Sequence, residues 1–133
     1  MFSRRNSKTA RSLNVLVVDD DYFMQRTLVL YLNSLGHSGI VVENGQQAME
    51  CLAVKCFDVI LLDVTMPVMD GLEVLAAIRQ QEKIRNAHQL IIMVTGYAEA
   101  DDLSKLKKAG ADGYVIKPVD TNQLEAELKR VVR

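Results

Sequence analysis

The sequence predicts an α/β domain in which five parallel strands form one doubly wound sheet with five helices. The chain has 133 residues, of which 49% are hydrophobic and 25% charged, enough for one domain with a substantial core. Five short apolar runs show little polar alternation, as expected of parallel strands buried on both faces. A stretch with helical spacing follows each run, and right-handed crossovers would place these helices on both faces of the sheet.

The expected strands are runs of aliphatic and β-branched residues, which favour extended chain. They lie at residues 15–18, 40–42, 59–62, 90–94 and 114–116. Apolar residues spaced three and four apart mark the helices between them. The positions that define these helices are, in order, Met24, Leu28, Tyr31 and Leu35; Ala48, Met49, Leu52 and Ala53; Leu72, Leu75 and Ile78; Leu103 and Leu106; and Leu124, Leu128 and Val131.

Short polar residues and glycines mark the expected helix ends. Gly36 and Gly110 are expected to end the first and fourth helices, because glycine is favoured just past a helix. Capping residues are expected before three helices, and these are Asp21, Asp70 with Glu73, and Asp120 with Gln123.

Residues 1–13 are predicted to form a disordered basic tail or linker, and residues 14–133 a single domain. Residues 1–14 have a net charge of +4 and residues 15–133 have a net charge of −5. The negative charge of residues 15–133 argues against nucleic-acid binding by the domain. No apolar run approaches the roughly 20 residues of a membrane helix, and no secretory signal is recognisable, so we expect no membrane insertion and a cytoplasmic location. Cys51 and Cys56, expected within one helix, would be idle thiols.

Polar residues stand at the carboxyl ends of four of the expected strands. Asp19 and Asp20 follow the first strand, Asp63 ends the third, Thr95 ends the fourth and Lys117 follows the fifth. Ligands of a doubly wound sheet bind beyond the carboxyl ends of its strands, so we expect these side chains to converge. Two carboxylates about 4 Å apart repel by about 4 kcal/mol at an effective dielectric of about 20. A bound cation would relieve this repulsion, and carboxylate ligands suit Mg²⁺, with Mn²⁺ as an alternative.

The first strand-to-helix turn distinguishes between two uses of such a sheet. A nucleotide site needs a glycine-rich turn, whereas this turn is Asp19-Asp20-Asp21-Tyr22, which would repel a pyrophosphate. A cation, an ammonium group and a hydroxyl around a carboxylate instead suit phosphoryl transfer to an aspartate. Asp63 is the better acceptor candidate, because its strand should be central and its neighbours Val64 and Met66 are apolar.

Four motifs together resemble one family. They are Leu16-Val-Val-Asp-Asp-Asp21, Asp63-Val-Thr-Met-Pro-Val-Met-Asp-Gly71, Val94-Thr-Gly96 and Tyr114-Val-Ile-Lys-Pro118. In this order they resemble the receiver domain of two-component response regulators (CheY-like), over roughly residues 14–132. The resemblance implies the flavodoxin-like strand order 2-1-3-4-5 and a phosphorylation switch rather than a turnover enzyme.

The resemblance implies roles for the residues around the acceptor. Asp63 would accept a phosphoryl group from a histidine kinase or a histidine phosphotransfer protein. Asp20, Asp63 and the main-chain carbonyl of Thr65 would bind Mg²⁺, with Asp19 acting nearby, often through water. Thr65 and Tyr97 occupy positions that tune the lifetime of the phosphoryl group in relatives, and we expect the bulky Tyr97 to slow hydrolysis.

The resemblance also implies how the switch would respond. Lys117, which could otherwise be an ordinary surface lysine, would pair with the phosphoryl group, and its bond to Pro118 is expected to be cis. Thr95 would move toward the phosphoryl group while Tyr114 turns inward, although Tyr114 could simply be packed. This shift would remodel the face made by the fourth helix, the fifth strand and the fifth helix, where an effector docks.

Several alternatives stay open. The chain could be a stand-alone receiver, a phosphorelay intermediate or a receiver cut from a hybrid histidine kinase. A haloacid-dehalogenase-like phosphatase also uses an aspartate nucleophile, but places it after the first strand. A third alternative is an interaction module that keeps the fold without the chemistry. His37 and His88 are assigned no role.

Overall fold

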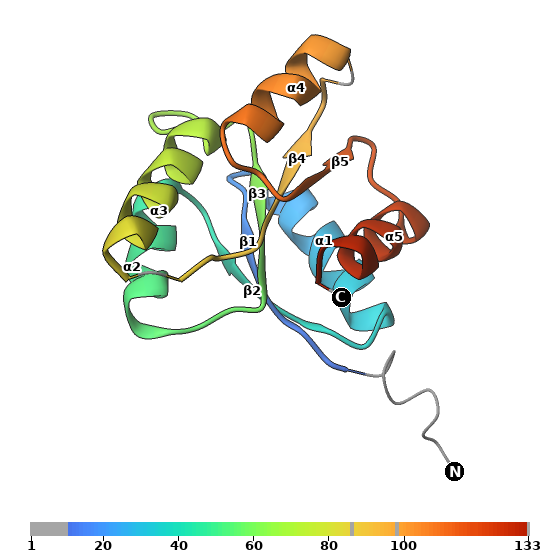
Figure 1. Cartoon of the computed structure of the whole chain (residues 1–133). Helices are drawn as coiled ribbons and strands as arrows, with labels where there is room; N and C mark the ends of the chain where they lie inside the picture. The colour runs from blue at the N-terminus through green and yellow to red at the C-terminus, as the bar shows by residue number, and fades with distance from the viewer. Residues whose placement is uncertain (1–10, 86, 98, 133) are drawn as a thin grey trace.

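The computed structural model describes residues 11–85, 87–97 and 99–132, and Figure 1 shows how their strands and helices are arranged. Along this part of the chain the elements are β1 (Asn14–Val18), α1 (Tyr22–Ser34), β2 (Ser38–Val42), α2 (Gly45–Val54), β3 (Val59–Asp63), α3 (Gly71–Arg85), β4 (Ile91–Thr95), α4 (Ala100–Lys108), β5 (Gly113–Ile116) and α5 (Thr121–Val132). All strand pairs are parallel and the sheet order is β2-β1-β3-β4-β5, so the predicted fold class and strand order are confirmed.

The strands agree with the predicted runs to within two residues at each end. β2 begins at Ser38, two residues earlier than predicted, because its backbone pairs with Asn14 of β1. β3 and β4 each extend by one polar residue, Asp63 and Thr95. Pairing with the neighbouring strand therefore sets the strand ends, and Asp63 and Thr95 end their strands as expected.

Helices cover both faces of the sheet, as predicted. Figure 1 shows α1 and α5 on one side and α2 and α3 on the other. The first apolar cluster uses Leu28, Leu32, Leu124 and Leu128 from α1 and α5. The second uses Ala48, Val74, Leu75, Ile78 and Leu106 from α2, α3 and α4. Every residue of β3 and β4 is buried, so these two interior strands form a closely packed support for the residues at their carboxyl ends.

Most predicted helix ends are confirmed. Asp21 accepts a hydrogen bond from the Phe23 amide at 3.3 Å, and Asp70 and Glu73 bond to each other's amides at 2.9 Å. Gly36 and Gly110, with φ of 89° and 107°, follow α1 and α4. One cap was not predicted: the side chain of Asn44 accepts a hydrogen bond from the Gln47 amide at 2.8 Å at the start of α2.

The predicted capping box before α5 is half wrong. Asp120 Oδ1 accepts a hydrogen bond from the Gln123 amide at 2.7 Å, as expected. The Gln123 side chain instead turns to β5, where its Nε2 donates to the Ile116 carbonyl at 3.0 Å and its Oε1 accepts from the Ile116 amide. The reason is that β5 is an edge strand, whose outward backbone groups need partners from elsewhere.

The prediction that both cysteines lie in one helix is also wrong. α2 ends at Val54, because the next residue, Lys55, is extended with φ −135° and ψ 151°. Cys51 therefore lies in the helix and is partly buried, while Cys56 follows it and is exposed.

The predicted tail falls mostly outside the described residues, which begin at Arg11. Leu13 is buried in the first apolar cluster, and Arg11 Nη2 lies 2.8 Å from Asp58 Oδ1. Contacts with the domain therefore begin before residue 14. Among the helices described, none has both the length and the apolar character needed to cross a membrane.

Candidate functional site

The candidate site lies where four adjacent strands end. β1, β3, β4 and β5 are neighbours in the sheet and run in the same direction, so their carboxyl ends form one edge. Asp19 follows β1, Asp63 ends β3, Thr95 ends β4 and Lys117 follows β5. The Lys117 amide donates to the Thr95 carbonyl at 2.7 Å, and the Lys117–Pro118 bond is cis, as expected. The structure thus brings together the residues that the sequence predicted to converge.

Three carboxylates gather at this edge. Asp19, Asp20 and Asp63 each place one oxygen within 4.8 Å of the others. Asp19 and Asp63 are only 1% and 3% exposed, whereas Asp20 is exposed. One ammonium group, that of Lys117, lies 3.1 Å from Asp63 Oδ1. The negative charge of the cluster thus exceeds the positive charge that Lys117 supplies.

The surroundings of Asp19 disfavour the negative charge of its carboxylate. Its Oδ1 accepts a hydrogen bond from the Asp21 amide at 2.9 Å, but its Oδ2 is buried and accepts none from the described residues. Burial raises the pKa of Asp19 from 3.8 to about 6, and the charges of Asp63 and Asp20 act in the same direction against the Asp21 amide and Lys117. A buried carboxylate oxygen without a donor, beside two further carboxylates, fits a divalent cation.

Asp63 combines burial with a cationic partner. Its Oδ1 accepts hydrogen bonds from Lys117 Nζ at 3.1 Å and from the Thr65 amide at 3.3 Å. Burial raises the pKa of Asp63, and this effect exceeds the lowering by Lys117 and by the Thr65 amide. Lys117 therefore contacts Asp63 and does not lie apart from the candidate site.

Thr95 is buried at the end of β4, and its hydroxyl faces the loop that follows. The Tyr97 amide donates to Thr95 Oγ1 at 2.9 Å, and no hydrogen bond joins this hydroxyl to Asp63 among the described residues. Tyr97 is 56% exposed, and Thr65, whose amide donates to Asp63, is exposed as well. Tyr114 of β5 is 39% exposed, so its side chain is not simply packed in the core.

Two residues that support the site were not assigned this role from the sequence. A Cβ on Gly71 would overlap the Asp63 carbonyl oxygen and lie 2.8 Å from the Val64 Cα, so the start of α3 can approach the loop after Asp63 this closely only through glycine. Gln25 Nε2 donates to the Asp19 carbonyl at 2.6 Å from the buried face of α1. The sequence did contain a signal for Gln25, because this polar residue lies three positions before Leu28 and seven before Leu32, at helical spacing from both.

Comparisons with known proteins identify a family. Residues 15–129 match the family model described as the response regulator receiver domain. The chemotaxis response regulator CheY4 of Vibrio cholerae has a solved structure similar to this one, with a TM-score of 0.82 and 30% identity over 91% of this chain and 99% of that chain.

Two curated relatives are much longer than this chain. The "Probable transcriptional regulator ycf27" of Cyanidium caldarium is 34% identical over 96% of this chain and 49% of that protein. The "Sensor protein GacS" of Pseudomonas syringae pv. syringae is 35% identical over 87% of this chain and 13% of that protein. The chain thus spans about half of one relative and about an eighth of the other. With its five-stranded sheet and the family match over most of its length, the chain belongs to the receiver domain family of two-component response regulators.

Proposed function

We propose that this receiver domain is a phosphorylation-dependent switch in which Asp63 accepts a phosphoryl group from the phosphohistidine of a histidine kinase or a histidine phosphotransfer protein. The observation that supports this most directly is the 3.1 Å contact between Lys117 Nζ and Asp63 Oδ1, beside two further carboxylates. Asp63 is buried on a central strand, and its neighbours hold its carboxylate in one orientation. These features suit a nucleophile that reacts once per cycle.

The transfer would proceed by direct displacement. One carboxylate oxygen of Asp63 attacks the phosphorus atom while the P–N bond to the donor imidazole breaks, and the imidazole nitrogen keeps the electron pair. The product is an acyl phosphate on Asp63. Lys117 would contact the transferred oxygens, and the Thr95 hydroxyl would donate a hydrogen bond to one of them.

The acidic cluster would hold the metal ion. Receiver domains bind Mg²⁺ through an acidic pocket, and here Asp19, Asp20, Asp63 and the main-chain carbonyl of Thr65 are the proposed ligands, for Mg²⁺ or for Mn²⁺. A bound Mg²⁺ would offset the negative charge of the carboxylates and of the transferred phosphoryl oxygens. Asp19 supports this assignment most clearly, since its Oδ2 is buried without a donor.

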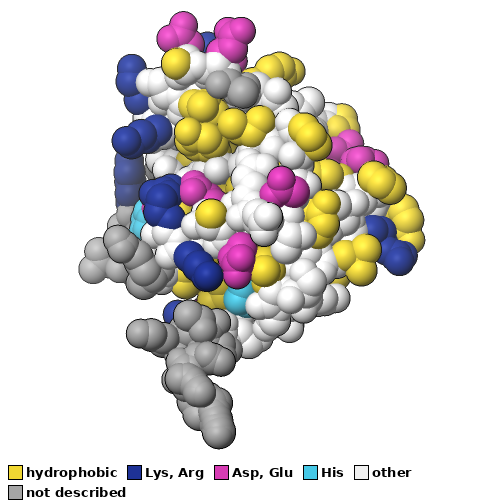
Figure 2. Space-filling model, turned by 90° about the vertical axis from the view of Figure 1, so that its right-hand side faces the viewer, with side chains coloured by type: hydrophobic (Ala, Val, Ile, Leu, Met, Phe, Trp, Pro, Cys, Tyr) yellow, Lys and Arg dark blue, Asp and Glu magenta, His cyan; other side chains and the backbone are white. Residues whose placement is uncertain are grey.

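The response would begin at Thr95. Its hydroxyl now accepts from the Tyr97 amide, and turning it toward the phosphoryl group would release that bond and leave room for Tyr114 to move inward. The exposed parts of α4, β5 and α5, which we call the α4–β5–α5 face, would change as a result. Basic residues lie in the last turns of both helices, and Figure 2 shows Lys and Arg side chains along one margin of this side of the molecule.

The setting of the domain follows from its family. Receiver domains act in signalling with histidine kinases and effectors. We propose a cytoplasmic protein without nucleic-acid binding of its own, with residues 14–133 as the receiver and residues 1–13 as a tail or linker. The similarity to a sensor protein keeps open a receiver from a hybrid histidine kinase, beside a stand-alone switch.

Acetyl phosphate with Mg²⁺ tests the proposal. The wild type should gain the mass of one phosphoryl group on the peptide that contains Asp63, and Asp63→Asn should gain none. Asp101→Asn, in the exposed first turn of α4, is the matched control and should be labelled like the wild type.

Two results would contradict the proposed switch. Labelling at another residue in the wild type would show that Asp63 is not the acceptor. Continuous release of phosphate from phosphomonoesters would favour the haloacid-dehalogenase-like alternative, because a receiver is labelled once and then hydrolyses slowly.

A further inference from the structure

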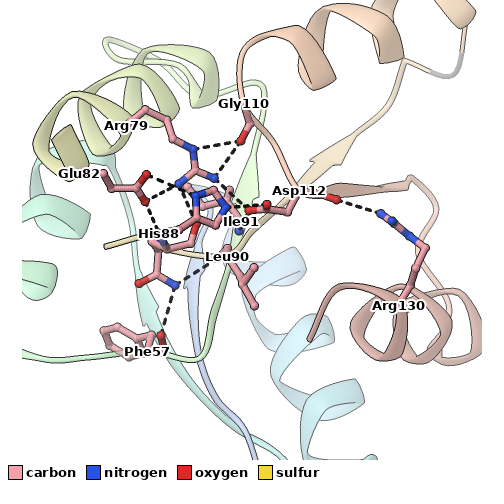
Figure 3. A network of polar contacts seen from close by, with 10 residues as sticks. Phe57, Arg79, Glu82, His88, Leu90, Ile91, Gly110, Asp112 and Arg130 are labelled. Carbon is pink, nitrogen blue, oxygen red and sulfur yellow. Dashed lines mark hydrogen bonds and ion pairs between the residues drawn. The ribbon is translucent and has the colours of Figure 1, made fainter. Parts of the chain in front are cut away.

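A dense polar network lies at the opposite end of the sheet from the acceptor, at the amino ends of β4 and β5. Figure 3 shows Arg79 of α3 at its centre, facing Glu82, Gly110 and Asp112. The side chain of Arg79 is only 17% exposed. Its Nη1 donates to Glu82 and, at 2.7 Å, to the Gln89 carbonyl. An arginine with so many partners holds several segments in one arrangement.

The guanidinium of Arg79 binds the end of α4. Nε and Nη2 both donate to the Gly110 carbonyl, at 3.0 and 2.8 Å, directly after the last turn of that helix. Gly110 has φ 107°, and a Cβ there would lie 3.3 Å from Arg79 Nε. The glycine thus supplies both the turn that ends α4 and the room for the guanidinium.

Asp112 extends this attachment into the sheet. Its Oδ2 accepts from Arg79 Nη2 at 3.0 Å and from the Ile91 amide of β4 at 2.9 Å. Its Oδ1 lies 2.7 Å from His88 Nε2, and its carbonyl accepts from Arg130 of α5 at 2.9 Å. The carboxy-terminal end of α4 is therefore tied to α3, β4, β5 and α5.

The amino-terminal end of α4 has fewer polar attachments to other elements among the described residues. Its N-cap residue, Glu99, makes no side-chain capping bond. Leu106, in the second half of the helix, is buried, whereas Leu103, in the first half, is only partly buried against the second apolar cluster. Figure 1 shows α4 at the margin of the molecule, with its first turn extending away from the sheet. The polar network therefore holds the carboxy-terminal end of the helix, whereas the described contacts of its first half are the packing of Leu103 and backbone hydrogen bonds such as that from the Leu103 amide to the Glu99 carbonyl at 3.1 Å.

We propose that Arg79 is a positioning residue that makes the carboxy-terminal end of α4 a fixed pivot. A change at Asp63 and Thr95 then moves the amino-terminal half of α4, while Gly110 and Asp112 stay bound to α3. This inference rests on the proposed function, because it concerns how the α4–β5–α5 face responds to the acceptor. It predicts that the response is concentrated in residues 99–105.

Amide hydrogen exchange, resolved by NMR, tests the pivot in two states of the full chain. In the resting protein, the hydrogen-bonded amides of residues 109–112 should exchange at least 10-fold more slowly than those of residues 103–105. Mg²⁺ with beryllofluoride, an analogue of the phosphoryl group, should change exchange at residues 103–105 at least 5-fold and at residues 109–112 less than 2-fold.

Three variants separate the pivot from general stability. Arg79→Met should reduce the resting contrast between the two segments below 3-fold and let the beryllofluoride response spread to residues 109–112. Arg79→Lys, which keeps one charged donor, should restore part of the contrast. Lys83→Met, an exposed change on the same helix, should behave like the wild type.

Specific outcomes overturn the pivot. One is equal protection of the two segments in the resting wild type, and another is an equal beryllofluoride response in both. A third is uniformly faster exchange throughout Arg79→Met, which would mean a purely structural role. If beryllofluoride does not shift the amide signals beside Asp63, the proposed function fails instead. The difference in exchange rate between residues 103–105 and 109–112, compared in the resting wild type and the three variants, then decides by itself whether Arg79 holds the end of α4.

Discussion

At the scale of single residues, the site is shaped by carboxylates in places that disfavour their charge. Asp19 and Asp63 are buried, and burial raises the pKa of both. Lys117 offsets part of this for Asp63, with which it is hydrogen bonded, and less for Asp19. Without a cation the protein thus pays in folding free energy for holding these charges together.

Asp19→Asn should therefore stabilise the metal-free protein at neutral pH. The pKa of Asp19 is about 6 in the folded state and near 3.8 otherwise, so the folded state binds its proton more readily. The stability linked to this proton is complete below about pH 3.8 and is lost as the pH rises through about 6. The variant carries no charge at position 19 at any pH, so its free energy of unfolding at pH 7.5 should exceed that of the wild type by about 1–3 kcal/mol.

Urea unfolding in the presence of a chelator measures this difference. The gap between the two proteins should narrow toward pH 4, where the wild-type Asp19 is protonated. Added Mg²⁺ should stabilise the wild type more than the variant. A variant less stable than the wild type at pH 7.5 without metal would contradict the assignment of a buried, unfavourable charge.

Tyr97 permits a second prediction about a single side chain. Tyr97 is exposed, and its amide donates to Thr95 Oγ1 at the end of β4. On the proposed function, its ring would hinder water that attacks an acyl phosphate on Asp63. Tyr97→Ala should increase the rate of dephosphorylation several-fold, measured after acetyl phosphate is removed. Tyr97→Phe keeps the bulk and should retain the wild-type rate. An unchanged rate in Tyr97→Ala would rule out steric protection by the ring.

At the scale of elements, the conformation of the loop between β3 and α3, which follows Asp63, depends on how closely α3 approaches the end of β3. The Gly71 amide donates to the Val64 carbonyl at 2.8 Å, and the Asp63 and Val64 backbones leave no room for a side chain. The capping pair Asp70 and Glu73 fixes the first turn of the helix at this point. The geometry of Asp63 is therefore set by the junction of a strand and a helix.

Gly71→Ala should disturb this junction. The added Cβ would meet backbone atoms, which must shift, so we expect a loss of about 1–3 kcal/mol in the free energy of unfolding and weaker beryllofluoride binding. Gly96→Ala is the control, since its Cβ would meet nothing within 4 Å, and it should cost less than about 0.5 kcal/mol. Equal stability losses in the two variants, measured by urea unfolding, would contradict the close-approach explanation.

At the scale of the whole molecule, the two apolar clusters stabilise the folded domain, whereas the repulsion among the carboxylates at the acidic edge destabilises it. The clusters bury both faces of β3 and β4, while the edge concentrates charge at their ends. A ligand that binds the folded state alone adds stability that grows with its concentration. The metal should therefore act as a stabiliser of the entire domain and not only as a participant in the chemistry.

Thermal unfolding tests this coupling. At a free Mg²⁺ concentration of 100 times its Kd, the free energy of unfolding should rise by about 2.7 kcal/mol and Tm by several degrees. Asp20→Asn should lose most of this increase, while Asp101→Asn should keep it. A Tm independent of Mg²⁺ in the wild type would mean that the carboxylates do not bind it.

The sequence predicted the fold and the members of the site because both depend on local patterns. Buried parallel strands produce runs such as residues 59–62, and residues at the ends of such runs meet at one edge in this topology. Gln123 and Cys56 show where such patterns fail. The partner of Gln123 is the exposed edge of β5, and Cys56 lies beyond the point where the backbone of α2 becomes extended.

The sequence by itself determined which residues stand at the strand ends, how strands and helices alternate, and to which family the chain belongs. Only the tertiary structure decided that Lys117 faces Asp63, that Asp19 Oδ2 is left without a donor and that Arg79 clamps the end of α4. The physical reason is the range of the interactions. Apolar periodicity and capping act within about one turn of chain, whereas burial, charge and backbone partners depend on segments that only folding brings together.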